Sequence, residues 1–298
     1  MKLRGNSTMK YETVFDMVGN TPIVKIGKLN NATMWVKLEG ANPTGSLKDR
    51  TVLHVLQELQ PKQKKIIDAS SGSHACSLAY WGKVLGYEVT TVVNSKLSPD
   101  NETFLAAMGA RIVKYGATTS ESRDKCIEIM GGEENDWFFF DQLTNVNAPT
   151  AHQNGTAAEI FSELENVSAV VGSKGSGVTL TGVSRYITEH RLNTKIFGSC
   201  AILGDKAKLA GTYLHGVDFE TDFIKELALE PNYQDIQVGF SNSMTACLNL
   251  NKKGIPVGPQ GGGVYLAAIH AIQQDNITGN VVLIAGDTIL KNAGRFKN

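Results

Sequence analysis

The sequence predicts an α/β protein with two domains, each a mainly parallel, twisted sheet covered by helices. Short apolar runs alternate with stretches of helical periodicity along the whole chain, a pattern typical of parallel strands joined by helices. The chain has 298 residues, which is long for one domain and comfortable for two. Its 42% hydrophobic and 19% charged residues are ordinary for a globular protein.

The positions of the elements follow from the period of the apolar residues. Strands are expected at residues 33–37, 65–68, 89–93, 111–114, 169–172, 195–198 and 280–285. Helices are expected at residues 50–58, 76–85, 101–108, 155–164 and 263–273, with another beginning near Gly182. The polar, glycine-containing stretch 141–155 is predicted to cross between domains, and 200–233 is predicted to be a long loop region.

Charge and cysteine content exclude several classes of function. Lys plus Arg equals Asp plus Glu, 29 each, which argues against capture of nucleic acid or anionic membrane. The four cysteines form no CxxC motif, so we expect reduced thiols, a cytoplasmic protein and no metal site. The N-terminus does not resemble a signal peptide, and no apolar run approaches the ~20 residues of a membrane span.

A lysine stands at the start of the first expected helix. Residues 42–50 read NPTGSLKDR, in which turn and cap residues follow a strand and place Lys48 in the first helical turn. Helix N-termini favour negative charge, so a cation there does not serve helix stability. Position alone leaves two interpretations: a lysine that projects into a ligand cleft, or a solvated lysine followed by a surface pair of Asp49 and Arg50.

Two further loops combine small and hydroxyl residues between a strand and a helix. Residues 69–75 read ASSGSHA, which exposes backbone N–H groups suited to a carboxylate or simply caps the helix through a serine. Residues 175–182 read GSGVTLTG, which suits a phosphate or forms only a tight turn. Lys174, just before it, either supplements the charge at such a phosphate site or points to solvent.

Residues 42–50 closely resemble the cofactor-lysine segment of fold type II pyridoxal-phosphate (PLP) enzymes: cysteine synthases, cystathionine β-synthases and their dehydratase relatives. Three other segments resemble family elements in the same order, namely GNTPIV at 19–24, SPDNETFLAAMGARIVKYG at 98–116 and FDQLTNVNAPTAH at 140–152. The resemblance covers most of the chain except about 200–250. The chain is therefore identified as a divergent member of the cysteine synthase and cystathionine β-synthase family.

The resemblance implies a tryptophan synthase β-like fold and a homodimer. Residues 46–143 would form a smaller, mobile domain on the substrate side. Residues 1–45 together with 144–298 would form a larger domain that holds the cofactor phosphate. The expected partners are a small amino-acid substrate and a second copy of the chain, with no nucleic acid and no membrane.

Site residues are carried over position by position from the family's motifs. Lys48 would hold pyridoxal 5′-phosphate as a Schiff base and act as the catalytic residue. The expected cofactor-binding residues are Lys48, Ser73, Gly175, Ser176, Gly177, Val178, Thr179 and Gln260. The expected substrate-binding residues are Ser70, Ser71, Gly72, His74, Gln142, Tyr213 and His215.

Three of these positions depart from the family's pattern. Ser73 stands where an asparagine usually contacts the cofactor's ring hydroxyl. Val178 replaces the third glycine of a GTGGT-like phosphate cup and would be strained if its φ were positive. Gln260 takes the place of a serine that hydrogen-bonds the pyridine nitrogen; it either fills that role or points away.

A fourth departure is the segment 210–219, AGTYLHGVDF, where the family has a glycine-rich loop facing the substrate. Tyr213, His215 and Asp218 bring bulk and polar groups there. We expect them to recognise an altered substrate or to supply an extra acid–base group.

The implied reaction is β-replacement on an activated serine, O-acetylserine or O-phosphoserine. It passes through an α-aminoacrylate and gives cysteine or another β-substituted alanine. Lys48 would remove the α-proton as a general base. One alternative is a serine or threonine dehydratase-type lyase or a racemase, which the SHA sequence at 73–75 favours. Another is a catalytically impaired homologue that acts as a binding or regulatory protein.

Overall fold

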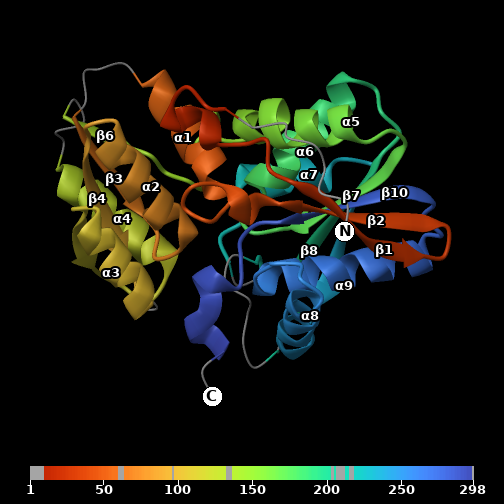
Figure 1. The fold of residues 1–298 in the computed structure, drawn as a ribbon. Coiled ribbons are helices and arrows are strands. Elements are labelled where there is room, and N and C mark those ends of the chain that lie inside the picture. Colours follow the sequence, from red (N-terminus) through yellow and green to blue (C-terminus); the bar gives the residue numbers. More distant parts are fainter. Residues whose placement is uncertain are drawn as a thin grey trace.

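The computed structural model describes residues 10–59, 64–95, 97–131, 136–202, 205, 212–214 and 218–296. These residues build two separate sheets, each with helices packed on it (Figure 1). The four-stranded sheet lies on the left of Figure 1 and the six-stranded sheet on the right. The predicted α/β class with mainly parallel sheets is confirmed.

The six-stranded sheet has the order β1-β2-β10-β7-β8-β9. Only β1 runs antiparallel to its neighbour, β2; the other pairs are parallel. Its central strand β10 reads GNVVLIA, a continuous apolar run expected for a strand buried on both faces. The strands are β1 (Ile23–Leu29), β2 (Ala32–Leu38), β7 (Val167–Ser173), β8 (Lys195–Ala201), β9 (Tyr233–Val238) and β10 (Gly279–Ala285).

Helices cover both faces of this sheet. Val281 and Leu283 pack with α9 on one face, while Val282 and Ile284 pack with α5 and α6 on the other. This alternation is the two-residue period of a β-strand. The helices are α5 (Ala158–Glu163), α6 (Val178–Glu189), α7 (Asp222–Ala228), α8 (Phe240–Lys252) and α9 (Pro259–Gln274). A π-helix at His152–Ala157 leads into α5, and short 3-10 helices span Val14–Met17, Glu39–Ala41 and Leu290–Phe296.

The four-stranded sheet is parallel throughout, in the order β5-β4-β3-β6. Its strands are β3 (Lys65–Ala69), β4 (Glu88–Val93), β5 (Arg111–Lys114) and β6 (Trp137–Phe139). The helices α1 (Lys48–Glu58), α2 (Ser73–Val84) and α3 (Pro99–Ala107) pack on one face, and α4 (Thr119–Met130) packs on the other.

All seven expected strands are present, with bounds that differ by up to three residues at either end. The helix expected near Gly182 begins four residues earlier, at Val178. The helix expected at 155–164 begins as the π-helix at His152. The region 200–233 is not one long loop, because it contains α7; part of it lies outside the described residues. The division of the chain at 46–143, and the mobility of that part, stay predictions.

The four cysteines are free and buried. No helix in the described part of the chain is long and apolar enough to cross a membrane.

A buried ionic network attaches α1 to the six-stranded sheet. Arg50, 5% exposed, forms a bidentate pair with Glu39 (Nε–Oε2 2.6 Å, Nη2–Oε1 2.9 Å). The same guanidinium forms a second bidentate pair with Glu159 of α5, at 2.6 and 2.7 Å. Glu39 follows β2 directly, so one side chain joins β2, α1 and α5.

A second cation completes the network. Nζ of Lys37, which is fully buried, lies 2.6 Å from Oε2 of Glu159 and donates to the carbonyl of Thr21 at 2.7 Å. Burial alone would raise the pKa of Glu159, but the hydrogen bonds and charges of Arg50 and Lys37 outweigh burial and lower that pKa to about 2. Because every charge has a partner, the network tolerates its burial.

Replacing Arg50 by methionine is expected to lower the free energy of unfolding by about 3–5 kcal/mol, because Glu39 and Glu159 would lose their partner while remaining buried. Urea denaturation followed by circular dichroism measures this loss. Arg185→Met is the matched control, since the Arg185–Glu226 pair is 35% and 38% exposed and should contribute less than about 1 kcal/mol. Equal losses in the two variants would contradict the assigned role of Arg50.

Candidate active site

Lys48 is the first residue of α1, and the residue before it is attached to the end of β10. The backbone N–H of Leu47 donates to the carbonyl of Gly286 at 2.9 Å, one residue past the last residue of β10. Lys48 therefore lies at the carboxyl edge of the six-stranded sheet. Open α/β sheets bind their ligands at this edge.

The amine of Lys48 is shielded from water, although the residue as a whole is partly exposed. Desolvation lowers the pKa of Lys48 from 10.5 to about 8, against the opposing effect of the Asp68 carboxylate. A substantial fraction of the amine is therefore neutral near pH 8. Nucleophilic and general-base chemistry both require the neutral amine.

Asp49 is fully buried, so the alternative of a surface pair of Asp49 and Arg50 is wrong. Its carboxylate accepts hydrogen bonds from the backbone N–H of Thr44 at 2.6 Å and from the Thr44 hydroxyl at 2.7 Å. It also accepts from Ser77 at 2.6 Å and from the indole of Trp81 at 3.0 Å. These bonds attach the turn before Lys48 to α2 and fix where the lysine emerges.

The expected carboxylate loop, residues 70–72, precedes α2 directly. Gly72 is the N-cap of α2 and provides no side-chain cap, which leaves the helix start suited to an anion. A Cβ placed on Gly72 would have no atom within 4 Å, so the loop borders open space. Ser73 is the first residue of the helix and is only partly buried.

His74 is buried beneath this loop and contacts a carboxylate. Its Nε2 lies 2.7 Å from Oδ2 of Asp68 near the end of β3, and both side chains are 2% exposed. Burial lowers the pKa of His74, opposed by Asp68 and reinforced by the charge of Lys48. Gln142 lies on the same strand end, because its Nε2 donates to the carbonyl of Ala69 at 3.0 Å. Lys48, Asp68 and His74 thus form an electrostatically coupled group.

The expected phosphate cup lies between β7 and α6. Gly177 adopts φ +87°, and α6 begins at the next residue, Val178. Val178 is not among the residues with positive φ, so the predicted strain at this position does not arise. The cup is supported by α7: Thr221 donates to the carbonyl of Ser176 at 2.7 Å, and Thr181 donates to the carbonyl of Phe223 at 3.2 Å.

Lys174, immediately before the cup, does not point to solvent. It is buried, 2% exposed, and its Nζ forms an ion pair with Asp235 of β9. The same ammonium lies 4.7 Å from the ring centroid of Tyr213. Tyr213 is itself buried, and its ring lies against the ammonium of Lys174. His215 lies outside the described residues.

Gln260 is the second residue of α9, and its side chain lies beside the Lys48 segment. A Cβ placed on Gly286 would lie 3.1 Å from Oε1 of Gln260 and 2.6 Å from Cδ2 of Leu47. Gly286 is therefore needed for this close approach. The predicted role of Gln260 at the pyridine nitrogen stays a prediction.

Sequence reasoning assigned no role to His152, which is fully buried between α1 and the cup. Its Nε2 lies 3.1 Å from Oγ1 of Thr51 and 3.3 Å from Oγ1 of Thr179. The histidine stands in the FDQLTNVNAPTAH segment, where only its partners in space reveal that it lies beside the cup.

Several buried polar atoms near Lys48 and at the carboxyl ends of both sheets have no hydrogen-bond partner among the described residues. They include Oγ of Ser46 before Lys48, Oδ1 of Asp287 after β10, Oγ of Ser173 at the end of β7 and Nδ1 of His74. Buried polar groups normally have partners, so such a concentration is expected at a ligand site. Together with the desolvated lysine and the glycine-bordered cup, it fits a group that carries an aldehyde and a phosphate.

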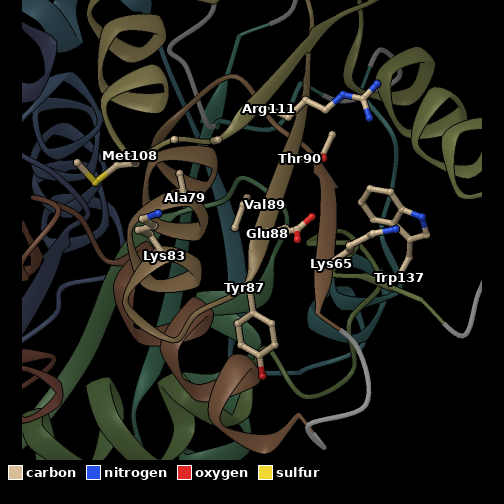
Figure 2. A pocket seen from close by; sticks show the side chains of 12 residues that line it. Lys65, Ala79, Lys83, Tyr87, Glu88, Val89, Thr90, Met108, Arg111 and Trp137 are labelled. Carbon is tan, nitrogen blue, oxygen red and sulfur yellow. The ribbon is translucent and has the colours of Figure 1, made fainter.

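A separate hollow of about 340 Å³ lies at the opposite, amino-terminal edge of the four-stranded sheet (Figure 2). The first residues of all four strands line it: Lys65, Glu88, Arg111 and Trp137. Figure 2 shows Lys65 beside Trp137, with Nζ 5.4 Å from a ring centroid of the indole. None of the site residues described above lines this hollow.

The fold and the partly desolvated lysine fit the class of α/β enzymes that use a carbonyl cofactor. The chain belongs to the pyridoxal-phosphate dependent enzyme family, whose family model matches residues 14–287. Membership confirms the predicted fold type II class, the PLP-dependent enzyme class and pyridoxal phosphate as the cofactor.

The chain is similar to curated proteins named cystathionine beta-synthase and cysteine synthase. Cystathionine beta-synthase of Saccharomyces cerevisiae is 28% identical over 305 residues, covering 91% of this chain and 60% of that protein. Cysteine synthase B of Salmonella typhimurium is 30% identical over 195 residues, covering 62% of this chain and 64% of that protein. The alignments therefore span less than two thirds of either relative. Cysteine synthase of Buchnera aphidicola is 26% identical, with 90% of this chain and 91% of that protein covered.

Solved structures share the fold. Cysteine synthase of Entamoeba histolytica superposes with a TM-score of 0.86 at 23% identity, covering 100% of this chain and 95% of that one. A hydrogen sulfide-producing enzyme of Fusobacterium nucleatum superposes with a TM-score of 0.81 at 25% identity, covering 95% and 98%. Both agree with the two-sheet architecture described above.

The amine of Lys48 is expected to titrate near pH 8 in the cofactor-free protein, because burial favours its neutral form. Acetylation by acetic anhydride at a series of pH values, with Lys48 followed by peptide mass spectrometry, measures the midpoint. Asp68→Asn should move the midpoint lower, since the Asp68 carboxylate raises this pKa. A midpoint at the usual 10.5, unchanged in Asp68→Asn, would contradict the assigned environment.

Gly177→Ala is expected to weaken cofactor binding about tenfold or more, because an added Cβ meets both a positive φ and the α7 backbone at 3.0–3.1 Å. Equilibrium dialysis against pyridoxal phosphate measures the affinity. Gly86→Ala is the matched control: it shares a positive φ of +83° but has no atom within 4 Å, and it lies away from the cup. A similar loss of affinity in both variants would show that the cup is not involved.

Proposed function

We propose that the protein catalyses β-replacement on an activated serine and gives cysteine or another β-substituted alanine. The proposal rests on one observation. A desolvated lysine lies at the carboxyl edge of the six-stranded sheet, which also carries the glycine-bordered cup. The open loop 70–72 follows β3 of the four-stranded sheet, where the Asp68 carboxylate interacts with the charge of the same lysine. Relatives named cysteine synthase and cystathionine beta-synthase support β-replacement as the reaction type. O-acetylserine and O-phosphoserine are the proposed substrates.

Four regions of the chain would hold the cofactor. Lys48 would bind it covalently, and the backbone N–H groups at the start of α6 would hold its phosphate together with Ser176 and Thr179. Gln260 would face the pyridine nitrogen as a neutral partner, and Ser73 would face the ring hydroxyl. When bound, the cofactor supplies an electron sink for charge that develops at the substrate α-carbon.

The chain's own residues would bind and orient the amino acid. The loop of Ser70, Ser71 and Gly72 would hold the α-carboxylate at the start of α2, with Gln142 beside it. Lys48, released from the cofactor, would accept the α-proton at Nζ, which requires the neutral amine favoured by its burial. The Asp68 carboxylate would then stabilise the resulting ammonium.

The remaining assignments are also proposals. Tyr213 would shape the wall of the substrate site from its place against Lys174. His215 would complete substrate recognition. We further propose a cytoplasmic homodimer that binds neither nucleic acid nor membrane.

One observation favours a second candidate, a dehydratase-type lyase. The contact between His74 and Asp68 places a further acid–base pair close to the charge of Lys48. Such a pair could serve a hydroxyl leaving group, which needs a proton to depart. Unactivated serine would then be the substrate, and pyruvate with ammonia the product.

The test uses the purified full chain. We expect a yellow protein that borohydride bleaches, with the reduced cofactor located on Lys48 by peptide mass spectrometry and absent from Lys48→Ala. Incubation with sulfide and, in turn, serine, O-acetylserine and O-phosphoserine should give cysteine from an activated serine.

The products separate the candidate functions. Pyruvate and ammonia alone, with sulfide present, would reject β-replacement in favour of the lyase. A colourless protein that does not retain pyridoxal phosphate would reject both and leave a binding or regulatory homologue.

A further inference from the structure

His152 lies where three helices meet. It begins the π-helix His152–Ala157, which packs between α1 and α6. Gly182 makes the approach to α6 close enough, because a Cβ there would lie 2.7 Å from Cβ of His152. Gly155 allows the π-helix to approach α1 closely, because a Cβ there would lie 2.9 Å from Nη1 of Arg50. The imidazole is therefore held in one position between the Lys48 helix and the cup.

Three threonine hydroxyls surround the ring. Nδ1 lies 3.0 Å from Oγ1 of Thr156, one helical turn further along. Nε2 lies 3.1 Å from Oγ1 of Thr51 in α1 and 3.3 Å from Oγ1 of Thr179 in the cup. Burial, reinforced by the charges of Arg50 and Lys48, holds the pKa of His152 well below its usual range. The ring is therefore neutral, with one N–H and one lone pair.

Nε2 therefore has two possible hydrogen-bond partners, the hydroxyls of Thr51 and Thr179. A ring nitrogen has a single in-plane hydrogen-bonding direction, either a proton to donate or a lone pair to fill, whichever tautomer is present. Thr51 and Thr179 both approach it from opposite helices. A ligand that reorients the Thr179 hydroxyl is therefore expected to change the hydrogen bond between His152 and Thr51.

We propose that His152 is a positioning residue that couples occupancy of the phosphate cup to the helix carrying Lys48. A phosphate group that engages the Thr179 hydroxyl leaves the Nε2 position to Thr51, three residues after Lys48. Binding of the cofactor's phosphate and placement of the lysine that receives its aldehyde are then linked events. This inference rests on the proposed function, because it takes the cup to hold a phosphate.

A double-mutant cycle tests the coupling. Thr51→Val and Thr179→Val, alone and together, are made in the full chain, and the affinity for pyridoxal phosphate is measured by equilibrium dialysis. In the described part of the chain, the Thr51 hydroxyl bonds to His152 and to no residue of the cup. Thr51→Val should nevertheless change the affinity about threefold or more. In the Thr179→Val background the same substitution should have no effect. Additive effects would overturn the proposal.

Thr51→Ser is the matched control, since it keeps the hydroxyl and should bind the cofactor as the unsubstituted chain does. The phosphorus NMR resonance of the bound cofactor should move in Thr51→Val and not in Thr51→Ser, a response that loss of packing alone would not produce. If it moved equally in both, the hydroxyl would not be the coupling group.

A measurement without substitutions guards against a variant that fails to fold. In protein labelled with ¹⁵N-histidine, the Nε2 resonance of His152 should shift when pyridoxal phosphate is added, while that of the exposed His190 should stay in place. An unchanged His152 resonance in the loaded protein would reject the coupling and leave the proposed function intact. Failure of the chain to bind pyridoxal phosphate at all would reject the proposed function itself.

Discussion

The guanidinium of Arg50 determines where Lys48 can lie. Arg50 stands two residues after Lys48 and forms ion pairs with Glu39, which follows β2, and with Glu159 in α5. A helix whose first turn is fixed in this way cannot slide along the sheet edge without exposing buried charge. Asp49 acts on the other side, because its four hydrogen bonds attach the preceding turn to α2. Lys48, which directly precedes both residues, is therefore positioned by contacts within the protein.

The sequence predicts the central strands because burial on both faces leaves a continuous apolar run, as in β10. It predicts the edge strand β5 but does not reveal the other edge strands, β1, β6 and β9. β9 reads YQDIQV, with polar residues at half of its positions, and β1 has no fully buried residue and is irregular at Gly27. α4 carries the polar sequence TSESRDKCIEIM and buries only Ser122 and Cys126, so its apolar period is weak. These elements are stabilised by capping and tertiary packing that a local window does not contain.

The same limit applies to the site. Lys48 and the two loops are recognisable because each belongs to a motif of contiguous residues. Asp49 reads as a surface acid, since the groups that bury it, Ser77 and Trp81, lie about thirty positions away. His152 gives no local signal either. At Val178 the backbone is unstrained, because the positive φ belongs to its neighbour Gly177. Contacts with residues far away in the sequence, rather than the local motif, determine which polar residues are buried.

The pairing of Lys174 with Asp235 has a consequence for how an anion would be held. The cation nearest to the cup in sequence is already neutralised, so attraction would come mainly from peptide dipoles and hydroxyls at the start of α6. Such forces act over a few ångströms, well inside the ~10 Å Debye length of 0.1 M salt. Retention of the cofactor should therefore depend only weakly on ionic strength, unlike anion sites built from lysine and arginine clusters. The cup would select its ligand by shape and donor geometry and would discriminate against other polyanions of the cell.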